Sequence, residues 1–444
     1  MDLTKGSILK TVFAFSIPFL LANIIQALYG AVDLMVVGKY CTADSVSAVS
    51  TGTQITQIIT SIISGLSVGA TVLVGRYKEM KKYDDIKYVI GTNLSLFIIT
   101  AIVLTVLMIV FSENILVALK TPKEAFSQAK DYVFICSCGI IFICGYNAIS
   151  AVLRGYGDSK SPLVFVFIAG CINIIGDIVL VKYFNMGVKG TAFATIFSQG
   201  ISMVCAVFYL NSKNFIFKFK ISNFKISKQK LIELAWVSIP ISFQECMVRL
   251  SFLYLTAVTN NLGVNASSAV GIASKYDVFA MLPATSIASA LTAIVSQNYG
   301  AKEYKRMTKS LFVGIALALP ISMLFFIWAQ FSPESMIGIF SNDKDIISTG
   351  IPFFKMCSYD YIFVLFVFCM NGYLNGRYKT IFTMISCCFG AIALRMPIIY
   401  YVCVNYPDNL KVVGMVAPFV SFVMAVYTFV YVMHLYKKDK KIKF

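Results

Sequence analysis

The chain has 444 residues, of which 58% are hydrophobic and only 13% are charged, and its formal net charge is +17. A soluble protein of this length would divide into two or three domains with polar surfaces. Long uncharged runs such as 97–111 and 311–331 exclude that class and predict a polytopic membrane protein.

Twelve apolar segments follow one another along the chain, each long enough for a membrane-crossing helix at about 20 residues per crossing. We expect no cleavable signal peptide, because the first segment is too long for a signal core and carries Asn23, Gln26 and Asp33. The expected fold class is an all-α integral membrane protein with twelve transmembrane helices. They are predicted at 12–36, 46–75, 88–111, 127–152, 162–183, 187–210, 231–259, 267–297, 308–331, 346–374, 379–403 and 411–436.

The sequence also repeats itself at a spacing of 221 or 222 residues. Ser16-Ile17-Pro18 recurs as Ser238-Ile239-Pro240, and Leu153-Arg154-Gly155 recurs as Leu374-Asn375-Gly376. Each copy holds six predicted helices, so both copies enter the membrane in the same orientation. We therefore expect two six-helix bundles related by a pseudo-two-fold axis along the membrane normal, a recurrent transporter architecture with a solute site where the halves meet.

The positive charges support one topology of these bundles. With both termini in the cytoplasm, the inner loops collect most of the Lys and Arg residues, as the positive-inside rule requires. The charge then anchors the topology and contacts anionic lipids, and nucleic acid is not an expected partner. We expect a monomer in the cytoplasmic membrane, divided into an N-terminal bundle 1–210, a cytoplasmic linker 211–230, a C-terminal bundle 231–436 and a basic cytoplasmic tail 437–444.

The sequence shows no metal or catalytic motif. The 12 cysteines lack zinc-ligand spacing, and the one histidine, His434, ends the last predicted helix. A nucleophile with its base is therefore not expected, so we predict that the protein is not an enzyme and needs no cofactor beyond a coupling ion.

Carboxylates within the first six helices are the strongest functional candidates, because each costs at least about 2.5–3.5 kcal/mol in the bilayer. Asp33 follows Pro18 in the first helix, where the proline permits a bend. Asn173 and Asp177 share one face of the fifth helix, and Thr195 lies in the sixth. Two neighbouring buried carboxylates disfavour double ionisation and can carry a proton between the two faces of the membrane. The same oxygens could bind Na⁺, or the cluster could only tie three helices together.

The second half has different intramembrane charges. Glu245 and Arg249 are four residues apart and can pair on the surface of the seventh helix, in a structural or a functional role. Asp277 lies in the eighth helix, where Lys275 could satisfy it locally. The possible second-half polar cluster comprises Gln244, Glu245, Arg249, Asp277 and Arg395, and Asp360 lies in the tenth helix.

Several motifs follow one another along nearly the whole chain: Asp33 itself, 153–158 closing the fourth helix, Asn173 with Asp177, 186–195 opening the sixth, and Gln297-Asn298-Tyr299-Gly300 closing the eighth. Together they resemble the bacterial type of the multidrug and toxic compound extrusion (MATE) family. The resemblance implies twelve helices in two bundles, a V-shaped central cavity and export of amphipathic, often cationic, compounds driven by H⁺ or Na⁺. The family's ion-linked quartet falls on Asp33, Asn173, Asp177 and Thr195, and Pro18 matches its bending proline.

The resemblance also has departures and leaves a rival function. Another branch carries a glutamate in the seventh helix and an aspartate in the tenth, whereas the aligned places here are apolar, near Val248 and Val364. The alternative to a cation-coupled antiporter is a lipid-linked precursor flippase of the same superfamily. A flippase for anionic headgroups should line its cavity with several cations, so convergence of Arg249, Lys275 and Arg395 would distinguish the two.

Overall fold

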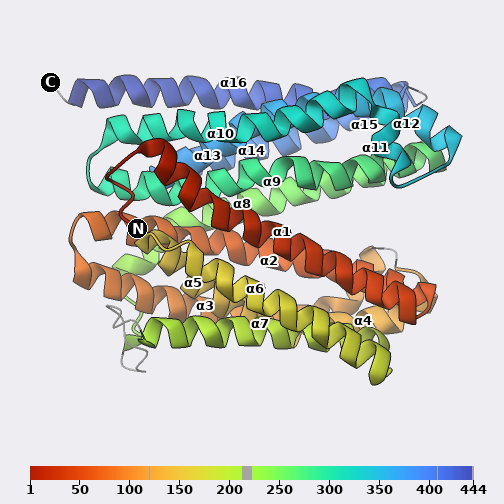
Figure 1. Ribbon diagram of the computed structural model, residues 1–444, viewed down its shortest axis with the longest axis horizontal. Coiled ribbons are helices and arrows are strands. Elements are labelled where there is room, and N and C mark those ends of the chain that lie inside the picture. Colours follow the sequence, from red (N-terminus) through yellow and green to blue (C-terminus); the bar gives the residue numbers. More distant parts are fainter. Residues whose placement is uncertain (120, 213–222, 408, 443–444) are drawn as a thin grey trace. The chain divides into compact units, whose positions relative to one another are not determined.

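The computed structural model describes residues 1–119, 121–212, 223–407 and 409–442, and these are almost entirely helical, with no strand among them (Figure 1). Eleven of the described helices are long and apolar enough to cross a membrane, or up to twelve if the bent pair α4 and α5 forms one span. This confirms the predicted all-α membrane fold.

The helices follow the sequence-predicted segments closely. In the first half they are α1 (Ile8–Tyr40), α2 (Ala43–Glu79), α3 (Tyr83–Ala118), α4 (Lys123–Cys138), α5 (Ile140–Tyr156), α6 (Lys160–Asp177), the π-helix η1 (Ile178–Tyr183) and α7 (Gly187–Ser212). In the second half they are α8 (Lys228–Thr259), the short η3 (Asn260–Leu262), α9 (Val264–Gly300), α10 (Tyr304–Phe331), α11 (Pro333–Gly338), α12 (Lys344–Cys357), α13 (Tyr359–Gly376), α14 (Thr380–Cys388), the π-helix η4 (Phe389–Arg395), α15 (Met396–Asn405) and α16 (Leu410–Ile442).

Contacts divide the chain into two compact units whose limits differ from the predicted domain limits. The first unit is Met1 with Leu21–Ser242, and the second is Asp2–Leu20 with Phe243–Phe444. The changes of unit therefore fall inside α1 and α8, just after Pro18 and Pro240, and not in the predicted linker 211–230. The ends of that predicted linker belong to α7 and α8, and residues 213–222 lie outside the described residues.

The repeat is present at the level of single hydrogen bonds. In the first unit the Thr71 hydroxyl on α2 donates to the carbonyl of Ala151 on α5, at 3.0 Å. In the second unit the Thr292 hydroxyl on α9 donates to the carbonyl of Gly372 on α13, at 3.1 Å. Both members of the second pair lie 221 residues after their counterparts. Each copy thus uses the same buried hydroxyl to join its second helix to its fourth.

A glycine in each copy allows the same pair of helices to approach closely. A Cβ atom on Gly155 would lie 2.6 Å from the carbonyl oxygen of Thr71, and one on Gly376 would lie 2.7 Å from that of Thr292. Contact this close with a backbone atom leaves no room for any side chain. The repeated Leu-x-Gly sequence therefore has a packing cause.

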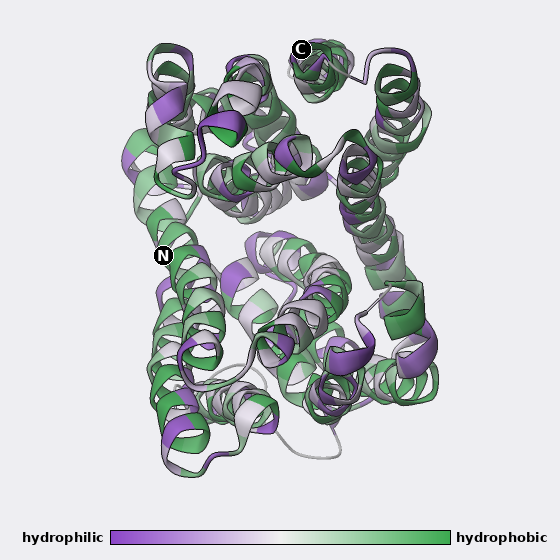
Figure 2. Ribbon diagram, turned by 90° about the vertical axis from the view of Figure 1, so that its right-hand side faces the viewer, coloured by the Kyte–Doolittle hydropathy of each residue, from purple (hydrophilic) through white to green (hydrophobic). Residues whose placement is uncertain are grey.

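Large apolar side chains face outward along helices that a soluble protein would cover with polar residues. On α3 the side chains of Ile102, Val106 and Val110 are all exposed, whereas Phe97 and Ala101 are buried. Figure 2 shows the hydrophobic colour over much of the helical ribbon. An exposed apolar stripe of this length is suited to lipid.

Two predicted segments of the second unit differ from the observed helices. The predicted tenth helix 346–374 is broken near Ser358 into α12 and α13. The predicted tail 437–444 continues α16 as far as Ile442, and residues 443–444 lie outside the described residues. Asp439 on this extension is buried and forms a two-point ion pair with Arg377, with both N–O distances at 2.9 Å.

Candidate functional site

Two glycines bring three helices of the first unit together. A Cβ on Gly170 of α6 would lie 3.0 Å from the Ile25 side chain of α1, and one on Gly176 would lie 3.0 Å from the Ala194 Cβ of α7. Because α6 approaches both neighbours at small residues, polar groups on its inner face can reach both of them.

The four residues predicted in the first half do converge. Asp33 of α1 lies within hydrogen-bond reach of Asp177 and Asn173 of α6. The Asn173 amide donates to the Thr195 hydroxyl of α7 at 3.4 Å, and that hydroxyl donates to the Thr191 carbonyl at 3.0 Å. Two carboxyl groups, an amide and a hydroxyl therefore form one cluster.

This first-unit cluster has an excess of oxygen acceptors. Asp33, Asn173 and Asp177 are 4%, 1% and 0% exposed. One oxygen of Asp33, both oxygens of Asp177 and the amide oxygen of Asn173 have no hydrogen-bond partner among the described residues. No lysine or arginine among the described residues forms an ion pair with Asp33 or Asp177. Since carboxylates cannot donate to each other, Asp33 and Asp177 form a hydrogen bond only when one of them holds a proton.

Two further side chains belong to this neighbourhood, although neither was assigned to the predicted ion-binding quartet. Tyr29 lies one turn before Asp33 on α1, near Tyr146 of α5, and its hydroxyl accepts a hydrogen bond from Gln199 of α7 at 3.5 Å. The spacing of Tyr29 and Asp33 places them on one helical face. Gln199 follows Thr195 by the same spacing, so helical periodicity could have found both.

The backbone changes its hydrogen-bonding pattern directly after Asp177. Residues Ile178–Tyr183 form a π-helix, and the Phe184 amide donates to the Val179 carbonyl at 3.1 Å. Short π-helical segments within α-helices occur frequently at functional sites. The fifth span therefore changes its helical register next to its carboxylate.

Pro18 lies inside α1, fifteen residues before Asp33. Its ring nitrogen cannot donate to the carbonyl four residues earlier, so the helix has one fewer internal bond at this point. The change of unit between Leu20 and Leu21 comes immediately afterwards.

The predicted second-half pairs are not formed. Glu245 and Arg249 make no ion pair within the described residues, and Arg249 is exposed. Lys275 does not satisfy Asp277, because its ammonium group lies 4.8 Å from the centre of the Phe340 ring. Closeness in sequence along one helix was therefore not enough to pair Glu245 with Arg249 or Lys275 with Asp277.

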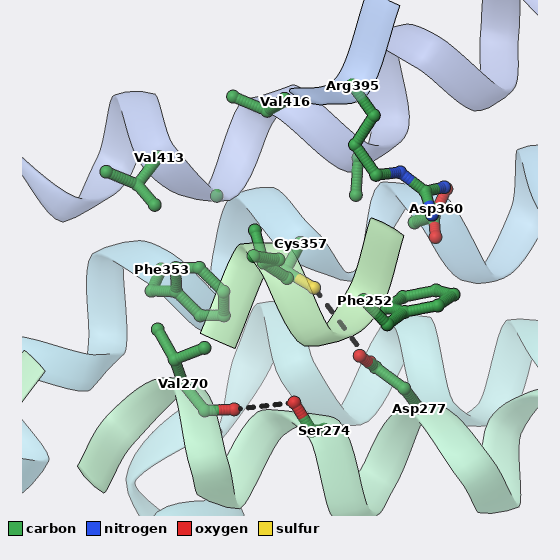
Figure 3. A pocket seen from close by; sticks show the side chains of 13 residues that line it. Phe252, Val270, Ser274, Asp277, Phe353, Cys357, Asp360, Arg395, Val413 and Val416 are labelled. Carbon is green, nitrogen blue, oxygen red and sulfur yellow. Dashed lines mark hydrogen bonds between the residues drawn. The ribbon is translucent and has the colours of Figure 1, made fainter. Parts of the chain in front are cut away.

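Asp277 and Arg395 do come together, but with a residue absent from the predicted cluster. Both line a cavity of about 20 Å³ in the second unit, and Asp360 lines it too (Figure 3). Glu245, Arg249 and Gln244 are not among the residues lining this cavity. Gln244 is buried, and its amide oxygen has no partner in the described part of the chain.

No group of three or more His, Cys, Asp or Glu side chains able to hold a metal ion occurs among the described residues. The candidate functional groups are therefore the first-unit cluster and the charged residues around the second-unit cavity.

Comparison with known sequences identifies the repeat independently. The sequence model of a family described as MatE matches this chain twice, at residues 18–179 and 240–401. The probable multidrug resistance protein YpnP of Bacillus subtilis is 28% identical over 386 residues, which cover 84% of each chain. The probable multidrug resistance protein NorM of Thermotoga maritima is 24% identical, over 88% of this chain and 85% of that protein.

Solved structures share the fold at low sequence identity. A MOP superfamily transporter from Pyrococcus furiosus, whose report describes reverse polarity of its binding pocket, aligns with a TM-score of 0.92 at 19% identity, over 99% of this chain and 98% of that one. A multidrug resistance MATE family transporter in an outward-facing conformation aligns with a TM-score of 0.91 at 20% identity, over 99% and 98%.

Proposed function

We propose, since the chain belongs to the MATE family of membrane transporters, that it is an antiporter exporting amphipathic, mainly cationic, small molecules in exchange for H⁺ or Na⁺. The names of similar proteins support this proposal, because they include probable multidrug resistance proteins and the multidrug export protein MepA of Staphylococcus aureus.

One observation carries the coupling part of the proposal. The first-unit cluster has two buried carboxyl groups and further oxygen atoms with no donor and no paired cation among the described residues. Such a site is costly in the bilayer unless it binds a positive charge. A proton shared by Asp33 and Asp177, or a sodium ion held by the same oxygens, supplies that charge.

Export follows if the ion and the substrate favour opposite conformations. Binding of H⁺ or Na⁺ to the first-unit cluster stabilises one arrangement of α1 against α6 and α7, and Pro18 lets α1 bend between the two arrangements. Coupling requires that each ligand has a different affinity for the two states. The chain acts as a monomer among membrane lipids, with both termini cytoplasmic and no cofactor besides the coupling ion.

The flippase alternative has less support. Of the three intramembrane cations that would have to converge on an anionic headgroup, only Arg395 lines the second-unit cavity, and two carboxylates line it as well. Arg249 is exposed on α8, and Lys275 lies over Phe340.

The test is efflux of a fluorescent cationic dye from reconstituted vesicles, with proton and sodium gradients imposed separately. We expect Asp33→Asn and Asp177→Asn each to lower gradient-driven efflux at least about tenfold, because either change removes half of the charge that binds the ion. Asp131→Asn is the matched control, since Asp131 is an exposed partner of Lys189 at 3.2 Å, and it should transport at the wild-type rate. Coupled efflux at the wild-type rate in both site variants contradicts the assignment.

A further inference from the structure

The second unit has its own group of charged side chains, which the proposed coupling site does not use; Asp360 and Arg395 are buried and Asp277 is half-buried. Asp277 comes from α9, Asp360 from the first turn of α13 and Arg395 from the last residue of η4. All three line one cavity of about 20 Å³, which is large enough for a single water molecule (Figure 3). Most of the other lining side chains are apolar.

Asp360 is the more deeply buried of the two carboxyl groups. It is 2% exposed, one of its oxygens has no hydrogen-bond partner among the described residues, and the Ser421 hydroxyl of α16 lies within hydrogen-bond reach of the group. Asp360 also interacts electrostatically with Arg395, but no ion pair within 4.0 Å joins the two in the described part of the chain. The carboxylate is therefore near a cation without being neutralised by direct contact.

Arg395 is held in place by groups that carry no charge. It is 8% exposed, its Nη1 donates to the Ser251 hydroxyl at 3.2 Å, and its guanidinium group lies 4.6 Å from the centre of the Phe252 ring. Its Nε has no partner among the described residues. Figure 3 shows the side chain extending toward Asp360. Arg395 thus supplies a fixed positive charge to the cavity.

Among the described residues, the hydrogen-bond donors to Asp277 are neutral. The Cys357 thiol of α12 donates to it at 3.9 Å, and the Tyr361 hydroxyl of α13 lies within hydrogen-bond reach. The Cys387 thiol of α14 also lies near Arg395. Thiols and phenols are ordinarily neutral at pH 7. Among the groups facing the cavity, Arg395 is thus the one fixed cation set against two carboxyl groups.

We infer that Asp277 and Asp360 share one exchangeable proton, balanced by Arg395, so that the second unit holds a proton-binding site of its own. Two ionised carboxylates with one guanidinium would leave a net negative charge in a water-poor interior, and that is costly. Uptake of one H⁺ converts one carboxylate to a carboxylic acid and makes the site neutral. A sodium ion is disfavoured, because it would lie beside the guanidinium group with few oxygen ligands.

The backbone around Arg395 supports a functional site. Arg395 ends the π-helix η4 in the second copy, and the π-helix η1 begins directly after Asp177 in the first. The fifth helix of each copy thus departs from α-helical register beside its ionisable residue, where functional sites are frequent.

Infrared absorption of protonated carboxyl groups tests the inference without any transport measurement. The background is the full chain carrying Asp33→Asn and Asp177→Asn, so the result is independent of the proposed first-unit coupling site. At pH 7 we expect a C=O band of a protonated carboxyl that disappears when either Asp277→Asn or Asp360→Asn is added, because one carboxylate is balanced by Arg395. Asp131→Asn, at an exposed position, should leave the band unchanged.

Replacing Arg395 should change the intensity of this band in the opposite direction. Arg395→Gln should raise the band about twofold, since both carboxyl groups then need a proton, whereas Arg395→Lys should restore the wild-type intensity. A band that neither aspartate variant alters overturns the inference, as does loss of the band when Na⁺ is added at constant ionic strength. The two Asp→Asn variants decide the question by themselves if Arg395→Gln does not fold.

Discussion

In the turn between α5 and α6, Asp158 accepts hydrogen bonds through both of its carboxylate oxygens. Oδ1 accepts from the backbone amides of Lys160 and Ser161, each at 3.1 Å. Oδ2 accepts from the Ser161 hydroxyl at 2.6 Å and from the Tyr209 hydroxyl of α7 at 2.9 Å. Partial burial alone would raise the pKa of Asp158, but these bonds outweigh it and hold the pKa below its ordinary value.

Asp158→Asn should therefore destabilise the protein by about 1–2 kcal/mol at pH 7, as for the loss of charge-assisted bonds at a helix start. Because the folded-state pKa is lowered, the ionised group stabilises the fold above the ordinary value of about 3.9. This contribution is lost as the pH falls through the lowered pKa, so the difference between wild type and variant should shrink in acid. Unfolding in detergent at several pH values measures it.

Tyr209→Phe is the matched control, because it removes one of these bonds and leaves the charge of Asp158 in place. Tyr209→Phe should therefore destabilise the protein by less than Asp158→Asn does at pH 7. A stability difference for Asp158→Asn that does not depend on pH would show that the carboxylate charge is irrelevant.

Single residues were predictable where their type was conspicuous. Asp33, Asn173 and Asp177 could be selected because carboxylates and amides are costly in an apolar span, and helical spacing placed the latter two on one face. Asp360 was noted in its helix but not joined to Asp277, since their place around one cavity depends on how α13 packs against α9. Lys275 was a plausible partner by sequence and lies over Phe340 instead.

At the scale of helices, we expect a Gly→Ala substitution to destabilise the protein where the glycine touches a neighbouring helix and not where it faces open space. Gly376→Ala should destabilise the protein by about 1–3 kcal/mol, because the new Cβ would lie 2.7 Å from the Thr292 carbonyl oxygen. A thermal melt in detergent measures the shift.

Gly271 provides the matched control. It lies inside α9 with nothing within 4 Å of the position that a Cβ would take, so Gly271→Ala should be neutral or stabilising by up to about 1 kcal/mol. Equal melting temperatures for the two alanine variants would contradict the packing explanation.

Helix positions were predicted well, but helix irregularities were not. The π-helical segments Ile178–Tyr183 and Phe389–Arg395 fall inside uninterrupted apolar runs that read as ordinary helix. The bend of 44° between α4 and α5, at Gly139, is likewise invisible in the hydropathy pattern. Such features depend on backbone hydrogen bonds and on neighbouring helices, neither of which alters the local composition.

For the whole molecule, the number of spans determines whether the two termini lie on the same side of the membrane or on opposite sides. The described residues contain eleven candidate spans, or up to twelve if α4 and α5 together form one. Twelve spans place both termini on the same side, and the positive-inside rule predicts that this side is the cytoplasm.

Epitope tags at both ends should therefore be reached by antibody only after the membrane is permeabilised. A tag inserted beside Asp343, in the connection before α12, should be reached from outside intact cells. Termini on opposite sides would mean that α4 and α5 do not cross together and would rule out the twelve-span topology.

The sequence by itself determined the membrane class, the positions of the helices and the internal repeat, because hydropathy and spacing are local properties of the chain. It also indicated the carboxylates of the first unit, since a charge in an apolar segment stands out. Only the tertiary structure decided that α1 and α8 change units after Pro18 and Pro240, and that Asp277, Asp360 and Arg395 share a cavity. The physical reason is that these contacts join helices far apart in sequence, and packing among many helices selects them.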